Sequence, residues 1–310
     1  MRATWVKWKD KTNEKSRPGL VRNSFILVGS SVALLAAAAY SAMPDAQSGP
    51  LEEARAEAAK VIRRALEEAD VGAAQLADTG AQAARLLGAD SLIAGDLLRI
   101  AEEARRPSAD PAAVRQALLK THATLTFQPL MEAELPRGFP APGPLGEIRV
   151  KEYPSYRMAV SKSGGTAFWT LFRHIKRHEI AMTTPVEMDY GDAASEDPAE
   201  ESMAFLYGNP EMGQAGTDGS VEVIDAEPVT VVSFGLTGSR SDAKIEEARD
   251  RLIAWVDKHS EYVIAGSLRV LGYNSPFVPR DRQYSEVQVP IRKIGESAGG
   301  SVQGVGSDSP

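Results

Sequence analysis

Alternating apolar and polar residues mark several strands in the C-terminal half of the chain, and two helical stripes interrupt them. Alternation with a period of two is typical of strands that bury one face. The first stripe places Phe168, Leu171, Phe172 and Ile175 on one side of a helix. In chain order the pattern predicts strands 147–153 and 156–160, helix 166–178, strands 180–188 and 203–207, strand 229–234, helix 241–260, and strands 267–273 and 284–291.

This order of elements occurs twice along residues 147–294. Strand, helix, strand and strand are followed by a second strand, helix, strand and strand. Two βαββ units in tandem predict a pseudo-twofold α+β domain in which a curved antiparallel sheet carries two helices. Facing sheet halves of this kind commonly leave a ligand cleft between them, and we expect one here.

Residues 51–122 have a different pattern, rich in Ala, Glu, Arg and Leu, which are strong helix formers. Breaks near Gly72, Gly80, Gly88 and residues 107–111 divide the stretch into about four short helices. Apolar residues recur at mixed three- and four-residue spacing, which is enough for a small bundle or hairpin but gives no sustained heptad. We expect a spacer or a surface for protein contacts.

Two segments lack the residues of regular structure. Residues 136–146 hold four prolines and three glycines, which cannot continue a helix or a central strand, so we expect a linker there. Residues 295–310 are rich in Gly and Ser with almost no large apolar side chain, and we expect a disordered tail.

Residues 24–42 are uncharged, close to the roughly 20 apolar residues that a helix needs to cross a bilayer. Strongly apolar side chains there contribute about −2 to −4 kcal/mol of insertion free energy. Residues 1–23 carry seven basic and two acidic residues, and acidic residues follow the stretch. The positive-inside rule therefore predicts a single-pass anchor at 24–43, with a cytoplasmic basic N-terminus and the rest of the chain outside the cytoplasm. A cleaved signal peptide, and hence a secreted or periplasmic protein, is the alternative.

Composition narrows the function classes. The net charge is −7 over 310 residues, and because residues 1–23 carry +5, the remainder carries −12. Nucleic-acid binding needs a clustered basic face, so we expect none in this acidic remainder. The absence of cysteine excludes disulfides, thiolate metal sites and covalent Cys-x-x-Cys-His haem attachment.

Four short strings carry a resemblance to a known family. They are Ile148-Arg-Val-Lys-Glu-Tyr-Pro154, Ala181-Met-Thr-Thr-Pro-Val186, Gly272-Tyr-Asn-Ser-Pro-Phe277 and Glu286-Val-Gln-Val-Pro290. In this order they resemble the haem-binding protein/SOUL family over about residues 147–292. The resemblance implies a distorted antiparallel β-barrel flanked by two helices, with non-covalent binding of haem or another tetrapyrrole. Some members have a proposed iron-ligating histidine in the opening strand, where this chain has Glu152.

Candidate binding residues follow from what a tetrapyrrole needs: a wide apolar slot, cations for its propionates and, optionally, an axial ligand. His174 and His178 have the i, i+4 spacing that lets two imidazoles share a helix face, and they are the weak candidates for an axial ligand; a solvated helix flank is the alternative. Met182 and Thr183 could equally be ordinary core and strand residues, and Tyr273 begins a stretch that is first of all a turn. The predicted ligand-binding set is Phe168, Phe172, Arg173, His174, His178, Met182, Thr183, Tyr273, Asn274 and Phe277.

The leading hypothesis is a membrane-anchored protein that binds haem or another tetrapyrrole in a hydrophobic cleft. The alternatives are a carrier or sensor of another amphipathic small molecule, and a structural, membrane-tethered interaction protein with contacts through residues 51–122. We find no Ser-His-Asp triad or paired-carboxylate motif and do not expect an enzyme.

Overall fold

The computed structural model describes residues 49–195 and 198–295, all within one compact unit that spans Asp45–Pro310. The predicted N-terminus 1–23, the predicted anchor 24–43 and nearly all of the predicted tail 295–310 lie outside the described residues. Within the described residues, no helix combines the length and the apolar character needed to cross a bilayer.

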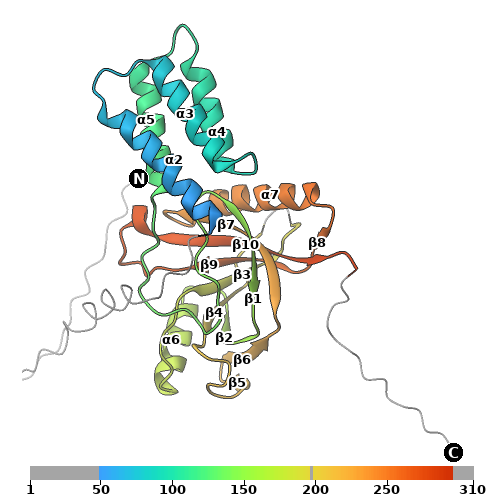
Figure 1. The fold of residues 1–310 in the computed structure, drawn as a ribbon. Helices are drawn as coiled ribbons and strands as arrows, with labels where there is room; N and C mark the ends of the chain where they lie inside the picture. The colour runs from blue at the N-terminus through green and yellow to red at the C-terminus, as the bar shows by residue number, and fades with distance from the viewer. Residues whose placement is uncertain (1–48, 196–197, 296–310) are drawn as a thin grey trace, which may run out of the picture. The chain divides into compact units, whose positions relative to one another are not determined.

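Four helices occupy the Ala-rich segment: α2 (Pro50–Glu67), α3 (Ala73–Leu87), α4 (Leu92–Ala104) and α5 (Pro111–Leu125) (Figure 1). Their starts follow from local chemistry. The Ser91 hydroxyl accepts from the Ala94 amide at 3.1 Å, and the Asp110 carboxylate accepts from the Ala112 amide at 2.9 Å. The helices share one apolar core built largely from alanine and leucine. Small side chains let the backbones approach closely, so the segment is a compact four-helix group.

The C-terminal domain is built on one antiparallel sheet of ten strands (Figure 1). The first half contributes β1 (Ile148–Tyr153), β2 (Tyr156–Lys162), β3 (Val186–Asp192), β4 (Ser202–Leu206) and β5 (Gly216–Asp218). The second half contributes β6 (Val221–Ala226), β7 (Val229–Thr237), β8 (Tyr262–Ile264), β9 (Ser267–Gly272) and β10 (Tyr284–Lys293). Helix α6 (Ala167–Arg177) follows β2, and helix α7 (Asp242–Lys258) follows β7.

The strand order shows the predicted internal repeat. The path β1-β7-β10-β9-β3-β4-β2-β6-β5 has β9 and β3 at its centre, and β8 pairs with β10. The set β2-β4-β3 in one half matches β7-β10-β9 in the other. The flanking strands are exchanged: β1 of the first half pairs with β7, and β6 of the second half pairs with β2. The exchange interlocks the two halves.

The sheet stays open, which corrects the expected barrel. No described strand joins β1 to β5 at the two ends of the path. Closing a barrel requires both end strands to pair in a consistent register. Here β5 is only three residues long and pairs with β6 alone (Gly216↔Val223 to Asp218↔Val221), so the ladder ends at this strand. The α+β class with an antiparallel sheet and two flanking helices is confirmed.

Both helices cover the same face of this sheet. Helix α6 packs on β2, β4 and β6 over a core that contains Leu171, Ile175 and Phe205. Helix α7 packs on β7, β8 and β10 over a core that contains Leu252 and Val287. The opposite face is therefore available for other contacts, and its strand residues are the alternate ones.

One predicted strand differs in extent, and one observed hairpin has no predicted counterpart. The strand expected over 180–188 begins only at Val186, because Pro185 lacks an amide for the ladder and the hydroxyls of Thr183 and Thr184 bind the carbonyls of Leu206 and Tyr273. The hairpin β5–β6 was not predicted. The four polar and two glycine residues among the nine in 216–224 hide the short alternation of β6.

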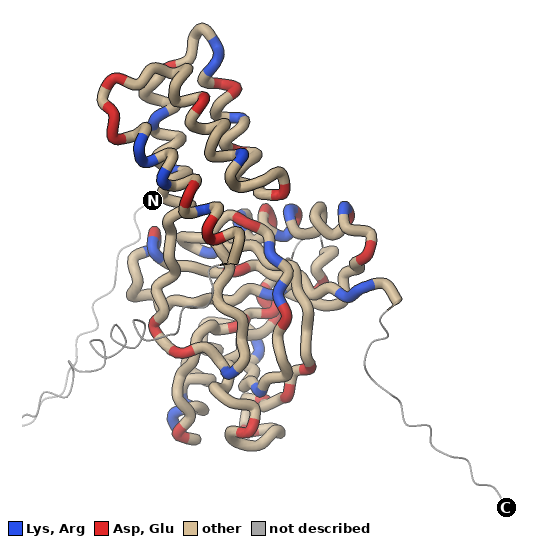
Figure 2. Tube along the Cα trace, viewed as in Figure 1, with Lys and Arg blue, Asp and Glu red and all other residues tan. Residues whose placement is uncertain are grey.

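A buried ionic contact joins the four helices to the domain. Glu147, just before β1, accepts from the Leu92 amide at 3.1 Å and from the Ser91 hydroxyl, so its carboxylate lies at the N-terminus of α4. Arg55 of α2 lies 3.7 Å from it and donates to the Thr124 carbonyl at 3.0 Å. Burial raises the pKa of Glu147. Over the described residues, Lys and Arg are interspersed with Asp and Glu (Figure 2).

Candidate functional site

Helix α6 and its C-cap carry five of the ten predicted site residues, on two different flanks. Successive residues of an α-helix are about 100° apart. Leu171 and Ile175 point to the sheet and are buried. By this spacing Phe172 and Trp169 lie to one side of that buried line, and His174 and His178 to the other. The helix therefore separates its aromatic residues from its histidines.

We call the first side the aromatic flank; it consists of Phe168, Trp169, Phe172, Arg173 and Lys176. The rings of Phe168 and Phe172 are stacked with centroids 6.1 Å apart, and Trp169 meets both edge-on. Trp169 is 60% exposed. The Lys176 ammonium lies 5.5 Å from the Phe172 ring centroid. Among the described arginines and lysines of α6, Arg177 forms an ion pair, with Asp218, whereas Arg173 and Lys176 form none. Arg173 and Lys176 can therefore bind an anionic group of a ligand.

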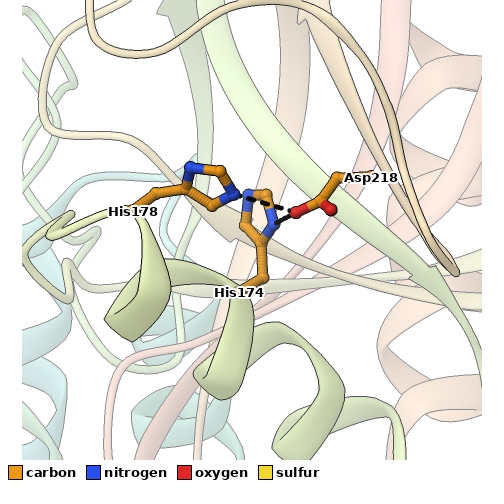
Figure 3. Close-up of side chains that lie close together, drawn as sticks. All are labelled: His174, His178 and Asp218. Carbon is orange, nitrogen blue, oxygen red and sulfur yellow. Dashed lines mark hydrogen bonds and ion pairs between the residues drawn. The ribbon is translucent and has the colours of Figure 1, made fainter.

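The second side holds a three-residue cluster, the histidine cluster of His174, His178 and Asp218 (Figure 3). His174 Nδ1 lies 2.7 Å and His178 Nε2 2.9 Å from the same Asp218 oxygen, which Arg177 also contacts. Hydrogen bonds from His178, His174 and Arg177 lower the pKa of Asp218 to about 2. The second nitrogen of His174 lies 2.9 Å from the Tyr207 hydroxyl. Both ring nitrogens of buried His174 are thus engaged.

The other predicted residues lie elsewhere. Met182 is half-buried in the core under α6, and the buried Thr183 hydroxyl donates to the Leu206 carbonyl at 2.6 Å. Tyr273 is buried on the other face of the sheet. Asn274 donates to the Leu130 carbonyl at 2.7 Å, and Phe277 is 95% exposed. The structure brings together the α6 aromatics and, separately, the histidines, but it does not gather all ten residues into one pocket.

The sheet face opposite the helices carries a buried polar network, which we call the polar face. Its members come from alternate positions of five strands and the segments that adjoin them. They are Lys151, Tyr153, Tyr156, Glu187, Arg269, Tyr273, Tyr284, Glu286 and Gln288.

Glu286 is the centre of the polar face and is fully buried. Lys151 Nζ lies 2.9 and 3.0 Å from its two carboxylate oxygens, and Gln288 donates to it at 2.7 Å. Hydroxyls of Tyr273 and Tyr284 each donate at 3.2 Å. Burial lowers the pKa of Lys151, while Glu286 opposes that shift. The pair is held by several hydrogen bonds, as a buried ion pair requires.

Arg269 is the second cation of the polar face. It donates to Gln288 at 3.0 Å and to the Tyr156 hydroxyl at 2.9 Å, and lies 3.4 Å from Glu187. Burial raises the pKa of Tyr156, with Glu187 acting in the same direction. The Nη2 atom of Arg269 is buried without a hydrogen-bond partner among the described protein atoms. A buried guanidinium nitrogen of this kind is commonly satisfied by an ordered water.

The connecting segment 127–145, here called the strap, covers the polar face. Phe139 meets the rings of Tyr153 and Tyr156 edge-on at 5.0 and 5.1 Å, and Phe127 stacks on Tyr284 at 5.9 Å. The Gly143 amide donates to Glu286. The segment 136–146 that was expected to be a Pro/Gly linker lies largely within the strap and packs its aromatic residue Phe139 onto the sheet.

Comparisons with known proteins match only the C-terminal part. Residues 146–290 match the family model described as SOUL heme-binding protein. The C-terminal domain is a SOUL-family domain. No curated protein sequence matches the chain.

Solved structures show weaker likenesses. The chain in an EcmrR–DNA complex is 14% identical, with a TM-score of 0.38, 48% of this chain covered and 58% of that chain spanned. The EcmrR C-terminal domain gives 14% identity and a TM-score of 0.37, over 48% of this chain and 98% of that one. A hydrolase from Listeria innocua gives 11% identity and a TM-score of 0.37, over 48% and 94% of the two chains. These values are too low to say more about this chain.

The SOUL domain's residues meet only part of what a tetrapyrrole needs. The apolar cleft expected between the two halves is not seen among the described residues, because buried side chains of the polar face and the strap fill the sheet face opposite the helices. The aromatic flank offers ring surface, and Arg173 and Lys176 offer cations for propionates. It offers no axial ligand, because His174 and His178 lie on the other flank and Glu152 is exposed on β1. On the polar face, Lys151 and Arg269 already have carboxylate partners. The aromatic flank therefore fits ring contact and charge, without iron coordination.

Trp169 and Asp218 on the two flanks of α6 were missed from the sequence, as were the charged members of the polar face. Glu187, Arg269 and Glu286 lie within strands, each next to a buried apolar residue: Met188, Leu268 and Val287. A charge at such a position signals either an exposed face or a paired interior. Because helices cover one face of this sheet and the strap covers the other, these charged residues are buried and paired with one another. The sequence alone did not show where the strap lies, so it did not show this pairing.

Proposed function

We propose that the SOUL domain binds a tetrapyrrole non-covalently on the aromatic flank of α6. The observation that carries the proposal is Trp169, which is 60% exposed and meets two other aromatic rings beside two cations. Contiguous apolar surface that remains exposed on a folded domain often marks an interaction site. The family match supplies the class of ligand.

Each part of the flank has a counterpart in the ligand. The flat macrocycle contacts the rings of Trp169 and Phe172, where offset or edge-on aromatic contacts contribute about 0.5–1.5 kcal/mol beyond the buried area. The propionates face Arg173 and Lys176. Haem, when bound, brings an iron centre, but none of the flank's own residues is placed to coordinate it.

Titration of the full chain with haemin tests the proposal. A saturable shift of the Soret band at one equivalent is expected. Trp169→Ala should weaken binding about tenfold, from the loss of about 1.4 kcal/mol of ring contact. The double variant Arg173→Gln with Lys176→Gln should also weaken haemin binding, and by a larger factor at low salt than at high salt.

Matched controls separate site effects from general ones. Leu98→Ala removes an exposed apolar side chain of α4, and Arg85→Gln removes an exposed cation of α3. Neither should change haemin affinity. An unsaturable titration, or equal affinity of wild type and Trp169→Ala, would contradict binding on this flank.

A carrier or sensor of another amphipathic molecule is the second candidate function. The observation that favours it is the lack of an axial ligand on the aromatic flank, because such a site does not require iron. Iron-free protoporphyrin IX should then bind within about threefold of haemin, a difference of less than 1 kcal/mol. Much tighter haemin binding would instead indicate coordination by a residue away from this flank. Mass spectrometry of ligand extracted from protein purified from its host identifies the natural molecule.

We further propose that residues 24–43 tether the protein to the cell membrane, with the SOUL domain outside the cytoplasm. The support is the uncharged stretch and the basic residues before it. The full chain should resist alkaline extraction from membranes, and protease added outside the cytoplasm should cleave the domain. Recovery of a shortened soluble chain from that compartment supports the secreted alternative. Recovery of the full chain from the cytosol contradicts both.

A further inference from the structure

We propose that the histidine cluster is a binding site for a zinc ion, independent of the tetrapyrrole proposal. His174 of α6 and His178 at its C-cap are about one turn apart, and Asp218 reaches them from the edge strand β5 (Figure 3). One ligand atom from each residue lies within 4.8 Å of the others. Two imidazole nitrogens and one carboxylate oxygen form a donor set that suits Zn²⁺ and leaves a fourth position for water.

The distances are close to those that a bound ion needs. With metal–ligand distances of about 2.1 Å, two ligands of a tetrahedral zinc lie roughly 3.4 Å apart. The present distances from the Asp218 oxygen are 2.7 Å to His174 Nδ1 and 2.9 Å to His178 Nε2. An outward shift of the carboxylate by about half an ångström would admit the ion. Asp218 ends a three-residue edge strand, and its side chain is 32% exposed, so such a shift displaces no core residue.

The surroundings favour a defined site over a chance cluster. His174 is buried, and its other ring nitrogen contacts the Tyr207 hydroxyl at 2.9 Å. A hydrogen bond of this kind fixes the orientation of a metal-binding histidine. His178 is 46% exposed, which leaves a path for the ion. Arg177 contacts the same Asp218 oxygen and would oppose a cation, but its side chain is 62% exposed and can move into solvent.

A zinc ion here would connect the β5–β6 hairpin to α6. Hairpin β5–β6 extends the first half of the sheet, and Asp218 is its contact with the histidines. The cluster lies on the flank of α6 opposite Trp169, so the zinc site and the tetrapyrrole surface can be disrupted separately.

Zinc titration of the full chain, purified without a histidine tag, tests the proposal. One equivalent of Zn²⁺ should bind with micromolar or tighter affinity in competition with a chromogenic chelator, and it should raise the thermal midpoint. Co²⁺ in its place should give the visible absorption of a tetrahedral or five-coordinate centre, a signature that a purely structural hydrogen-bond cluster cannot give. Asp218→Asn and His178→Ala should each weaken zinc binding at least tenfold. Both residues are partly exposed, so these variants keep the buried His174 in place.

Two controls complete the experiment. Glu222→Gln removes an exposed carboxylate from the adjacent strand β6, and His122→Ala removes a histidine from α5; both should bind zinc like wild type. Haemin affinity should be unchanged in Asp218→Asn. No stoichiometric zinc binding, or zinc binding that is equal in wild type, Asp218→Asn and His178→Ala, would overturn the proposal.

Discussion

The two halves of the SOUL domain share one plan but use their helices differently. Helix α6 has 11 residues and leaves Trp169 largely exposed, whereas α7 has 17 residues and half-buries Trp255. Trp255 stacks on His259 with ring centroids 3.7 Å apart. In the second half aromatic and histidine side chains stabilise the helix end. In the first half Trp169 and His178 are exposed, so that they can meet a ligand or an ion.

The strands added to each half differ as well. The first half gains the hairpin partner β5, which brings Asp218 to the histidines of α6. The second half gains β8, which pairs with β10 and packs under α7. The strands repeated in both halves form the sheet, whereas the strand added to each half, β5 or β8, determines which half can carry a site.

The largest expected effect is on the polar face, which both halves build together. Glu286→Ala removes the partner of buried Lys151 and should lower the free energy of unfolding by about 3–5 kcal/mol. Asp225→Ala, which breaks the pair between exposed Asp225 of β6 and Arg157 of β2, should cost far less. Urea unfolding of both variants measures the difference. Equal costs would mean that Glu286 is less essential than its contacts indicate.

Next in size is the strap. Phe139→Ala removes the ring that meets Tyr153 and Tyr156 edge-on, and since Phe139 is only partly buried, we expect a loss of about 2 kcal/mol. Hydrogen exchange of β1 and β7 amides should accelerate with it, because the cover of the polar face is loosened. Leu130→Ala, an exposed strap residue, is the matched control and should leave both quantities near wild type.

The comparison of the two helices is sharpened by a pair of tryptophan variants. Trp255→Ala in α7 should cost about 1–2 kcal/mol of stability, since it removes the stack with His259 and the contact with Tyr262. Trp169→Ala in α6 should change stability by less than about 0.5 kcal/mol, as is usual for exposed positions. Thermal unfolding gives both values. A large stability loss in Trp169→Ala would mean that this residue is structural and that its exposure has no functional meaning.

The smallest effect concerns pH and the contact between α4 and the domain. Burial raises the pKa of Glu147 above 4.5, so the folded state binds its proton more tightly than the unfolded state. Stability from this group is therefore greatest below pH 4.5 and falls as the pH rises through the folded-state pKa. Glu147→Gln should flatten this part of the stability–pH curve, measured by urea unfolding between pH 4 and 7. An unchanged slope would assign that pH dependence to other groups.

Much of the fold was readable from the sequence, because alternating strands and the stripes of α6 and α7 follow directly from burial on one face. Closure of the sheet was not readable, since the length of β5 is decided by the turn at 219–220 and by its hairpin pairing with β6, neither of which the polar pattern of this segment indicates. The prediction that His174 and His178 share a flank agrees with their common contact to Asp218. Asp218 itself stood in a polar loop pattern, and no local signal tied it to a helix 40 residues earlier.

The exchange of β1 and β6 limits how the two halves of the domain can be produced as separate fragments. Each half lends its leading strand to the other, as β1 lies along β7 and β6 along β2. A gene split in the turn between β5 and β6 would yield two fragments with unsatisfied backbone edges, prone to aggregate when made singly. Made in the same cell, they should reassociate, so that fragment complementation, not isolated expression, is the way to study either half.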